Sequence, residues 1–377
     1  MDKLFEPTNK FIKSTNLYKF QIYLEKKFLK KFSSYNKLWR WSNDHPQNFW
    51  ESIAEYFNIN LEKKKLFKAY NKKNYFWNST FFNNCNLNYY DLISKNNSSD
   101  TAIEFIGENK YKEIITYGDL NKRVNALSNF FQGLGIKKGD VVVGYLPNIP
   151  DTIISFLSAA KIGAVWSSCS ADFGTQAVID RFSQLKPKLL IIADHYFYNG
   201  KKFHYSKNLR LLKQKLNNPR ILKTSYPSNK SKSQLKKIIT QKKYKTINQH
   251  ILLDFNHPLY VLFSSGTTGL PKCITHGHGG SLLQHLKELA LHTNVKSKDK
   301  MLFLTTCGCL MCNWTVSILL LGSTIVLYDG SPFYPNTNRN IIMTNSTKTT
   351  MLGDGAKIYE TIHNYYKSNK KNVLKKI

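Results

Sequence analysis

Apolar and polar segments alternate regularly along the chain from about residue 101. Continuous apolar runs predict strands at 101–106, 113–117, 141–146, 164–168 and 188–193. Between these runs, apolar residues recur at helical spacing, which predicts helices at 120–134, 151–160 and 175–185. Strands that alternate with helices of about 10 to 15 residues are typical of a parallel sheet covered on both faces. We therefore predict an α/β fold of layered parallel or mixed sheets flanked by helices.

The same pattern resumes at Pro258 after an interruption. Strands are predicted at 259–264, 301–305 and 324–328, and helices at 280–292 and 310–321. The interruption, 197–250, is rich in Lys and Asn and has few apolar residues, so we expect a variable surface excursion there. Thr116 and Asp119 have the spacing of a capping box in front of the helix predicted at 120–134.

The first 95 residues have a different composition, rich in Lys, Asn and aromatic residues. A capped start of a short helix is predicted at 42–50, with apolar residues at helical spacing after it. We expect 1–95 to form an N-terminal cap packed on a larger domain that spans 96–377.

The charge of the chain is strongly positive, with 55 Lys and Arg against 24 Asp and Glu and a formal charge of +31. Only six of these cations are arginine, the residue whose guanidinium group forms bidentate hydrogen bonds with phosphate and guanine. Because the lysines are spread along the chain, we interpret them as solvated surface and expect no specific nucleic-acid partner. Nonspecific polyanion binding is the alternative.

Cellular location is constrained by what the sequence lacks. Six cysteines in 377 residues are too few for a disulfide scaffold. The N-terminus has no apolar signal region, and the longest apolar stretch, 314–328, is shorter than the ~20 residues of a membrane span. We therefore expect a cytoplasmic protein without a membrane partner.

The most informative segment follows the strand predicted at 259–264. It reads Ser-Ser-Gly-Thr-Thr-Gly-Leu-Pro-Lys over 264–272. Its glycines permit positive φ and close approach of the backbone to a ligand, and its hydroxyl and backbone N–H groups are donors suited to phosphate oxygens. Lys272 adds a mobile positive charge. With a strand before it and a helix predicted after it, this loop is expected to bind phosphate.

The loop differs from the Walker A motif, in which Gly directly precedes the Lys and Ser or Thr follows it. Pro271 and Cys273 occupy those positions here. A flexible polar turn without a ligand is the alternative interpretation, which the preceding strand and the Pro-Lys pair disfavour.

The segment SSGTTGLPK resembles the phosphate loop of the acyl-adenylate-forming, or AMP-binding, enzymes, which include acyl-CoA synthetases and luciferases. Residues 116–120 (TYGDL) and 160–164 (AKIGA) are similar to two further blocks of that family and occur in the family order. Within the family, the chain most resembles the acetoacetyl-CoA synthetase type, and acetyl- and propionyl-CoA synthetases are the alternative type. The segments that carry this finer resemblance are 45–50 (HPQNFW), 270–280 (LPKCITHGHGG), 313–314 (NW) and 328–335 (YDGSPFYP).

The resemblance implies ATP-dependent ligation of acetoacetate to CoA, a step of ketone-body and lipid metabolism. Acetoacetate would attack the α-phosphate of ATP, and the CoA thiol would then displace AMP. Lys272 would be an electrostatic clamp, because an exposed lysine stays protonated at pH 7, and Mg²⁺ would share the phosphate charge without protein side chains as ligands. The residues implied to hold the phosphates are Ser264, Ser265, Gly266, Thr267, Thr268, Gly269 and Lys272.

The resemblance also places the acyl pocket in 305–314 (TTCGCLMCNW), where Asn313 and Trp314 are the candidate residues. Relatives usually carry Trp at the positions of Cys309 and Cys312. The smaller side chains would enlarge the pocket, so the acyl substrate stays open. A role as an ordinary core aromatic is equally open for Trp314.

The cysteines of this segment also spell C-x-C-x₂-C, and His276 and His278 lie near them in sequence. Such residues could hold zinc, but the spacing matches no standard zinc finger. We expect the cysteines to be small buried thiols and the two histidines to be polar surface residues at a helix start.

The later blocks of the family have no match before Ile377. These are the adenine block, the Thr-Gly-Asp ribose block, the hinge and the C-terminal domain with its adenylation lysine. At 350–357, Asp354 and Gly355 replace the residues usual in relatives. We expect an incomplete AMP-binding domain that cannot complete the reaction alone and a companion chain that carries the later part. A noncatalytic polyanion-binding remnant is the alternative.

Overall fold

The computed structural model describes residues 6–204, 208–228, 234–241, 251–264 and 269–368. Its largest sheet has six strands in the order β10-β7-β5-β6-β12-β13. The first five strands of that order are parallel, and β13 is antiparallel to β12. The strands are β5 (Val141–Leu146), β6 (Val165–Ser170), β7 (Leu189–Ala193), β10 (Arg220–Thr224), β12 (Pro258–Ser264) and β13 (Lys272–Gly277).

A second sheet has five strands in the order β16-β14-β15-β3-β4. Only β4 is antiparallel to its neighbour. Two mixed sheets flanked by helices confirm the predicted fold class. The strands are β3 (Thr101–Gly107), β4 (Lys112–Thr116), β14 (Lys300–Phe303), β15 (Thr324–Asp329) and β16 (Met351–Gly353).

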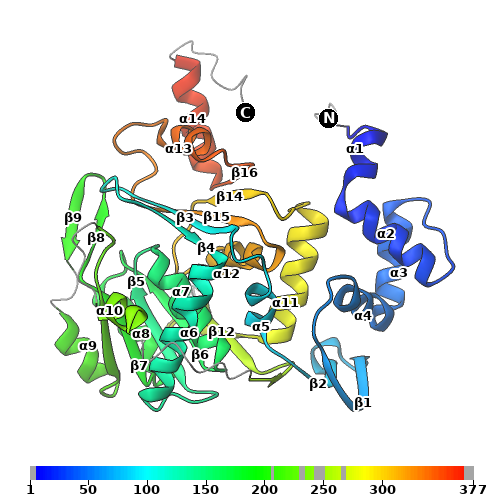
Figure 1. Cartoon of the computed structure of the whole chain (residues 1–377), viewed down its shortest axis with the longest axis horizontal. Coiled ribbons are helices and arrows are strands. Elements are labelled where there is room, and N and C mark those ends of the chain that lie inside the picture. Colours follow the sequence, from blue (N-terminus) through cyan, green and yellow to red (C-terminus); the bar gives the residue numbers. More distant parts are fainter. Residues whose placement is uncertain (1–5, 205–207, 229–233, 242–250, 265–268, 369–377) are drawn as a thin grey trace.

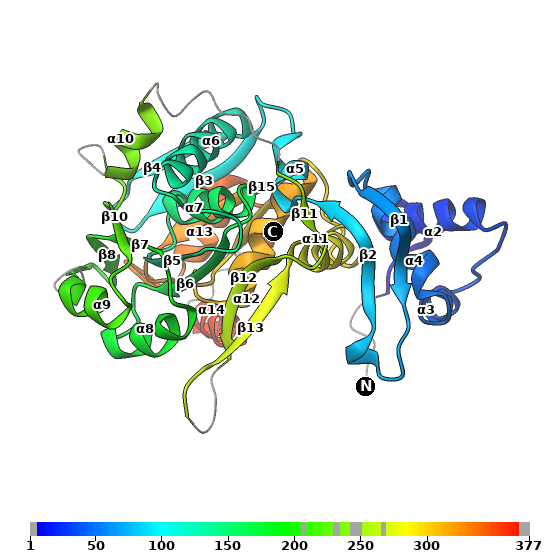
Figure 2. The ribbon, with the colours of Figure 1, turned by 90° about the horizontal axis from the view of Figure 1, so that it is seen from below.

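Helices separate the two sheets and cover their outer faces. The long helix α6 contacts β3 and β4, while α7 contacts β5 and β6, so this pair lies between the sheets. Figure 2 shows α6, α7 and α10 on one side of the larger sheet and α8 and α9 on the other. The helices are α5 (Tyr89–Ser94), α6 (Tyr117–Gly133), α7 (Pro150–Lys161), α8 (Thr175–Phe182) followed by the 3₁₀ turn Ser183–Leu185, α9 (Leu209–Lys215), α10 (Gln234–Thr240), α12 (Leu310–Val316) followed by the 3₁₀ turn Ser317–Leu321, α13 (Arg339–Thr347) and α14 (Ala356–Ser368).

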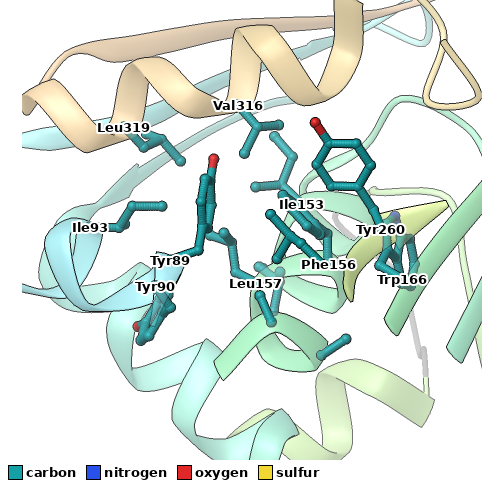
Figure 3. Close-up of a cluster of buried hydrophobic side chains, with 14 of the residues drawn as sticks. Tyr89, Tyr90, Ile93, Ile153, Phe156, Leu157, Trp166, Tyr260, Val316 and Leu319 are labelled. Carbon is teal, nitrogen blue, oxygen red and sulfur yellow. The ribbon is translucent and has the colours of Figure 1, made fainter. Parts of the chain in front are cut away.

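Buried aromatic side chains fill the space between these layers. Phe156 of α7 lies with its ring centroid 5.9 Å from that of Tyr89, 6.5 Å from Trp166 and 6.0 Å from Tyr260. Figure 3 shows this cluster reaching toward Val316 above it. Full burial of a large apolar side chain stabilises a fold by roughly 1.5–3 kcal/mol. The cluster therefore fixes α7 and β6 beside β12, the strand that leads into the predicted phosphate loop.

The N-terminal region lies beside these layers, and Figure 1 shows its helices at one side of the molecule. Asn16 connects it to the rest, since its side-chain amide donates to the carbonyls of Ala290 and Val295 at 3.1 and 2.9 Å. A small sheet in the order β1-β2-β11 joins the two parts. The elements concerned are α1 (Asn9–Ser14), α2 (Asn16–Lys27), α3 (Tyr35–Asp44), α4 (Pro46–Tyr56), β1 (Glu62–Asn71), the 3₁₀ turn Phe76–Asn78, β2 (Thr80–Leu87), β11 (Leu253–Asp254), α11 (His278–Leu286) and the π-helical turn Lys287–His292.

Only part of the segment 197–250, which was predicted to be a surface excursion, lies on the surface. A hairpin of β8 (His195–Tyr198) and β9 (Lys201–His204) does project with exposed residues. In contrast, β10 is the edge strand of the six-stranded sheet, and Leu222 is buried there. The prediction is wrong for β10, because a short apolar run among lysines gives little signal until β7 pairs with it.

Candidate functional site

The loop predicted to bind phosphate joins two antiparallel strands. Ser264 at the end of β12 pairs with Lys272 at the start of β13. The helix predicted at 280–292 is present as α11 and the π-helical turn after it, but β13, which was not predicted, lies between the loop and this helix. Donors from a helix N-terminus are therefore not part of the site. Ser265, Gly266, Thr267 and Thr268 lie outside the described residues.

The base of this hairpin is exposed and anchored. Gly269 has φ +109°, a conformation that favours glycine. The Gln184 side-chain amide donates to the Pro271 carbonyl at 3.0 Å, which fixes the hairpin to the 3₁₀ turn after α8. Figure 2 shows β12 and β13 running together away from the centre of the sheet. The exposed Lys272 makes no ion pair within the described part of the chain, so its charge is available to an anion.

A cavity of about 460 Å³ lies at the same edge of the sheet. Because β12 is parallel to β6, the loop and the cavity both follow carboxyl ends of strands, where open α/β sheets bind ligands. Pro147 follows β5, Ser170 ends β6, Leu304 follows β14 and Asp329 ends β15. The β8–β9 hairpin supplies an aromatic wall of Tyr196, Phe197, Tyr198 and Phe203.

The electrostatics of this cavity differ from those of the loop. Its lining residues include two acids, Asp172 and Asp329, and no Lys or Arg among the described residues. Burial raises the pKa of Asp329 to about 7, and the charges of Glu108 and Asp172 act in the same direction. The Asn148 backbone N–H opposes this by donating to the Asp329 carboxyl at 2.8 Å. The cavity is therefore unsuited to an anionic phosphate.

Sequence reasoning missed this acid as a site residue. Asp329 lies within the YDGSPFYP segment that carries the family resemblance. Its position at the end of a buried strand was the available signal, because strand ends gather at one edge of a sheet.

The two predicted acyl-pocket residues do not line this cavity. Asn313 is buried on α12 and borders a space of only about 10 Å³ together with Cys307 and Cys312. That is room for about one water molecule. Trp314 packs edge-on against Phe303, with ring centroids 5.9 Å apart.

The cysteines of the same segment do not converge on one point. Cys307 and Cys312 are buried, and burial raises the pKa of the Cys312 thiol to about 12, whereas Cys309 is exposed. No group of three metal-binding side chains occurs in the part of the chain that the structure describes. The prediction that His278 is a surface residue was wrong. It is fully buried, and burial lowers its pKa to about 3.

A larger hollow of about 870 Å³ lies between the N-terminal helices and the π-helical turn. None of the predicted site residues borders it. Among the described residues, no helix is long and apolar enough to span a bilayer.

The sequence profile of the AMP-binding enzymes matches residues 93–360. The chain belongs to this family. It is 34% identical to the acetoacetyl-coenzyme A synthetase of Rhizobium meliloti over 95% of this chain and 56% of that protein. It is 36% identical to the acetoacetyl-CoA synthetase of Mus musculus over 86% of this chain and 50% of that protein.

A solved structure is similar over the same span. The acetoacetyl-CoA synthetase from Streptomyces lividans superimposes with a TM-score of 0.90 at 30% identity, covering 97% of this chain and 57% of that one. The chain thus spans about half the length of the relatives that it matches.

Proposed function

We propose that this chain provides the nucleotide- and substrate-binding part of an acetoacetate–CoA ligase. The reaction converts ATP, acetoacetate and CoA into acetoacetyl-CoA, AMP and pyrophosphate through an acyl-adenylate. The observation that carries the proposal is the Ser/Thr/Gly-rich segment between β12 and β13, with the exposed Lys272 at its base. Similarity to proteins named acetoacetyl-CoA synthetase supports acetoacetate as the acyl substrate.

In this proposal Lys272 neutralises the β- and γ-phosphates while the loop hydroxyls and backbone N–H groups donate to their oxygens. The carboxylate of acetoacetate is already an anion at pH 7, so the first step needs positioning and charge neutralisation and no general base. Mg²⁺ suits this arrangement, because it commonly keeps water and phosphate oxygens as ligands and needs few protein ligands.

The 460 Å³ cavity is proposed to hold the thiol-bearing arm of CoA. ATP and acetoacetate are anions, and Asp172 and Asp329 would repel them. The arm of CoA is the substrate part without charge, and an aromatic wall suits it. The exposed Lys201 and Lys202 on β9 lie on the same hairpin and could meet the CoA phosphates.

Asn313 and Trp314 remain the proposed acyl-pocket residues. The space beside Asn313 must open for any acyl group to enter, because it is now smaller than acetoacetate. Acetate or propionate would need less room, so acetyl- or propionyl-CoA formation is the alternative.

The test is equilibrium binding by isothermal calorimetry. We expect the protein to bind ATP with Mg²⁺ and Lys272→Ala to weaken that binding about tenfold, the loss of one charge-assisted contact. Lys298→Ala on an exposed loop is the matched control and should bind as wild type. With α,β-methylene-ATP present, acetoacetate should bind more tightly than acetate or propionate. Equal ATP affinity for wild type and Lys272→Ala would contradict the role of the loop.

A further inference from the structure

One carboxylate joins two separate parts of the cavity wall. Glu108 follows β3 and is buried, with 9% of its surface exposed. Its carboxylate accepts three backbone N–H bonds, from Asn199 at 3.1 Å, from Gly200 at 2.7 Å and from Ser331 at 2.6 Å. Hydrogen bonds to an ionised acceptor are about twice as strong as those between neutral groups.

The three donors belong to segments far apart in sequence. Asn199 and Gly200 form the turn of the β8–β9 hairpin, which carries the aromatic wall. Ser331 follows Asp329 and Gly330, which line the cavity from the end of β15. Glu108 therefore fixes the aromatic hairpin relative to the acidic end of β15.

Two glycines permit this close packing. Gly330 has φ +144°, and a Cβ there would lie 2.6 Å from the Cβ of Glu108. Gly200 has φ +77°, and a Cβ there would lie 2.8 Å from the ring of Tyr334. In addition, the Glu108 backbone N–H donates to the Asp329 carbonyl at 2.9 Å. Glu108 is thus seated against the cavity wall by its backbone as well as by its side chain.

We infer that Glu108 is a positioning residue that sets the width of the cavity by holding the β8–β9 hairpin and the 329–332 segment together. The hairpin needs such a link, since Tyr198 and Phe203 are 50% and 40% exposed and β9 has no buried residue. The identity of the ligand rests on the proposed function, in which the arm of CoA enters this cavity.

The test compares Glu108→Gln with Glu104→Gln. Glu104 lies on the same part of the fold, in β3, and pairs with Lys300 at 2.9 Å without contacting the hairpin. Gln keeps one acceptor oxygen and places an NH₂ donor where the other carboxylate oxygen stood, so at least one of the three backbone N–H groups loses its acceptor and faces a donor instead. We expect Glu108→Gln to speed hydrogen exchange at Asn199, Gly200 and Ser331 about tenfold or more and to weaken CoA binding about tenfold. ATP affinity should be unchanged in both variants.

Glu108→Asp is a second variant in case the amide disturbs folding. It keeps the charge but is shorter by one methylene, so it should give the same changes at smaller size. Unchanged exchange at the turn, or faster exchange with unchanged CoA affinity, would overturn the inference. Failure of the wild-type protein to bind CoA would instead contradict the proposed function. The exchange rates would then still decide whether Glu108 holds the two walls together.

Discussion

Asp329 shows how strongly position changes the chemistry of a single residue. In an unfolded chain its carboxyl ionises near its ordinary pKa of 3.8, whereas burial at the end of β15 raises the pKa to about 7. Between these values the folded protein binds a proton that the unfolded chain has lost. The free energy of unfolding therefore falls as pH rises from about 4 to 7 and stays at the lower level above that.

We expect Asp329→Asn to remove this pH dependence. Asparagine keeps an oxygen for the Asn148 N–H but never ionises. The variant should gain stability relative to wild type as pH rises from 5 to 8, by about 3 kcal/mol at most. Urea unfolding at each pH measures this, with the exposed Asp44→Asn as control. A constant difference between wild type and Asp329→Asn across this range would show that Asp329 ionises normally.

Candidate site residues that lie together in the sequence could be predicted, whereas residues whose partners are distant in the sequence could not. The loop ending in Lys272 is recognisable because its glycines, hydroxyls and lysine are contiguous. Glu108 has no such signal, since its partners lie between 91 and 223 residues away. Asn313 was predicted from position in a resembling segment, which says nothing of the space around its side chain.

At the scale of elements, buried segments were predicted best. The strand predicted at 141–146 is β5 with the same bounds, because a fully buried run has a sharp start and end. The element missed at the site is β13. Its residues are exposed or half-buried, so it lacks an apolar run, and it is a strand because β12 pairs with it.

The start of α6 offers a test of local sequence signals. The Thr116 hydroxyl accepts the Asp119 backbone N–H at 3.1 Å, which confirms the N-cap bond of the predicted capping box. Thr116→Ala should lower the free energy of unfolding by about 1 kcal/mol, because that N–H loses its partner. Thr361→Ala is the control, since its hydroxyl donates to the Lys357 carbonyl within α14 and alanine favours helix interiors.

Thermal and urea unfolding of both variants would measure the effect. Equal losses in the two variants would mean that the Thr116 cap contributes nothing beyond the general cost of removing a hydroxyl.

At the scale of the whole molecule, the alternation of predicted strands and helices indicated layered sheets, but it could not predict which strands belong to which sheet. The chain builds β3 and β4 into one sheet, then β5 to β7 into the other, and later returns to each. Residues 101–107 therefore pair with 324–329, more than 200 positions away. Such pairing depends on burial of complete faces and on the packing of α6 and α7 between them.

The net charge of +31 raises a question that also belongs to the whole molecule. A nucleic-acid site needs its cations on one face. Here Lys63, Lys64 and Lys65 are exposed on β1, and Lys201 and Lys202 are exposed on β9. Figure 1 shows these strands at opposite ends of the molecule. This distribution supports solvated surface rather than a polyanion-binding site.

We expect single-stranded RNA to bind weakly, with a dissociation constant of about 10⁻⁴ M near 150 mM salt, the weak end of nonspecific binding. Fluorescence anisotropy of a labelled oligonucleotide at 50, 100 and 200 mM salt would measure it, because the Debye length shortens as the salt concentration rises. The ATP·Mg²⁺ affinity of the same sample provides the control. A specific phosphate-binding site should still bind ATP·Mg²⁺ at salt concentrations at which RNA has dissociated. Submicromolar RNA binding at 150 mM salt, with a steep slope in log salt and no ATP binding, would favour the noncatalytic polyanion-binding alternative instead.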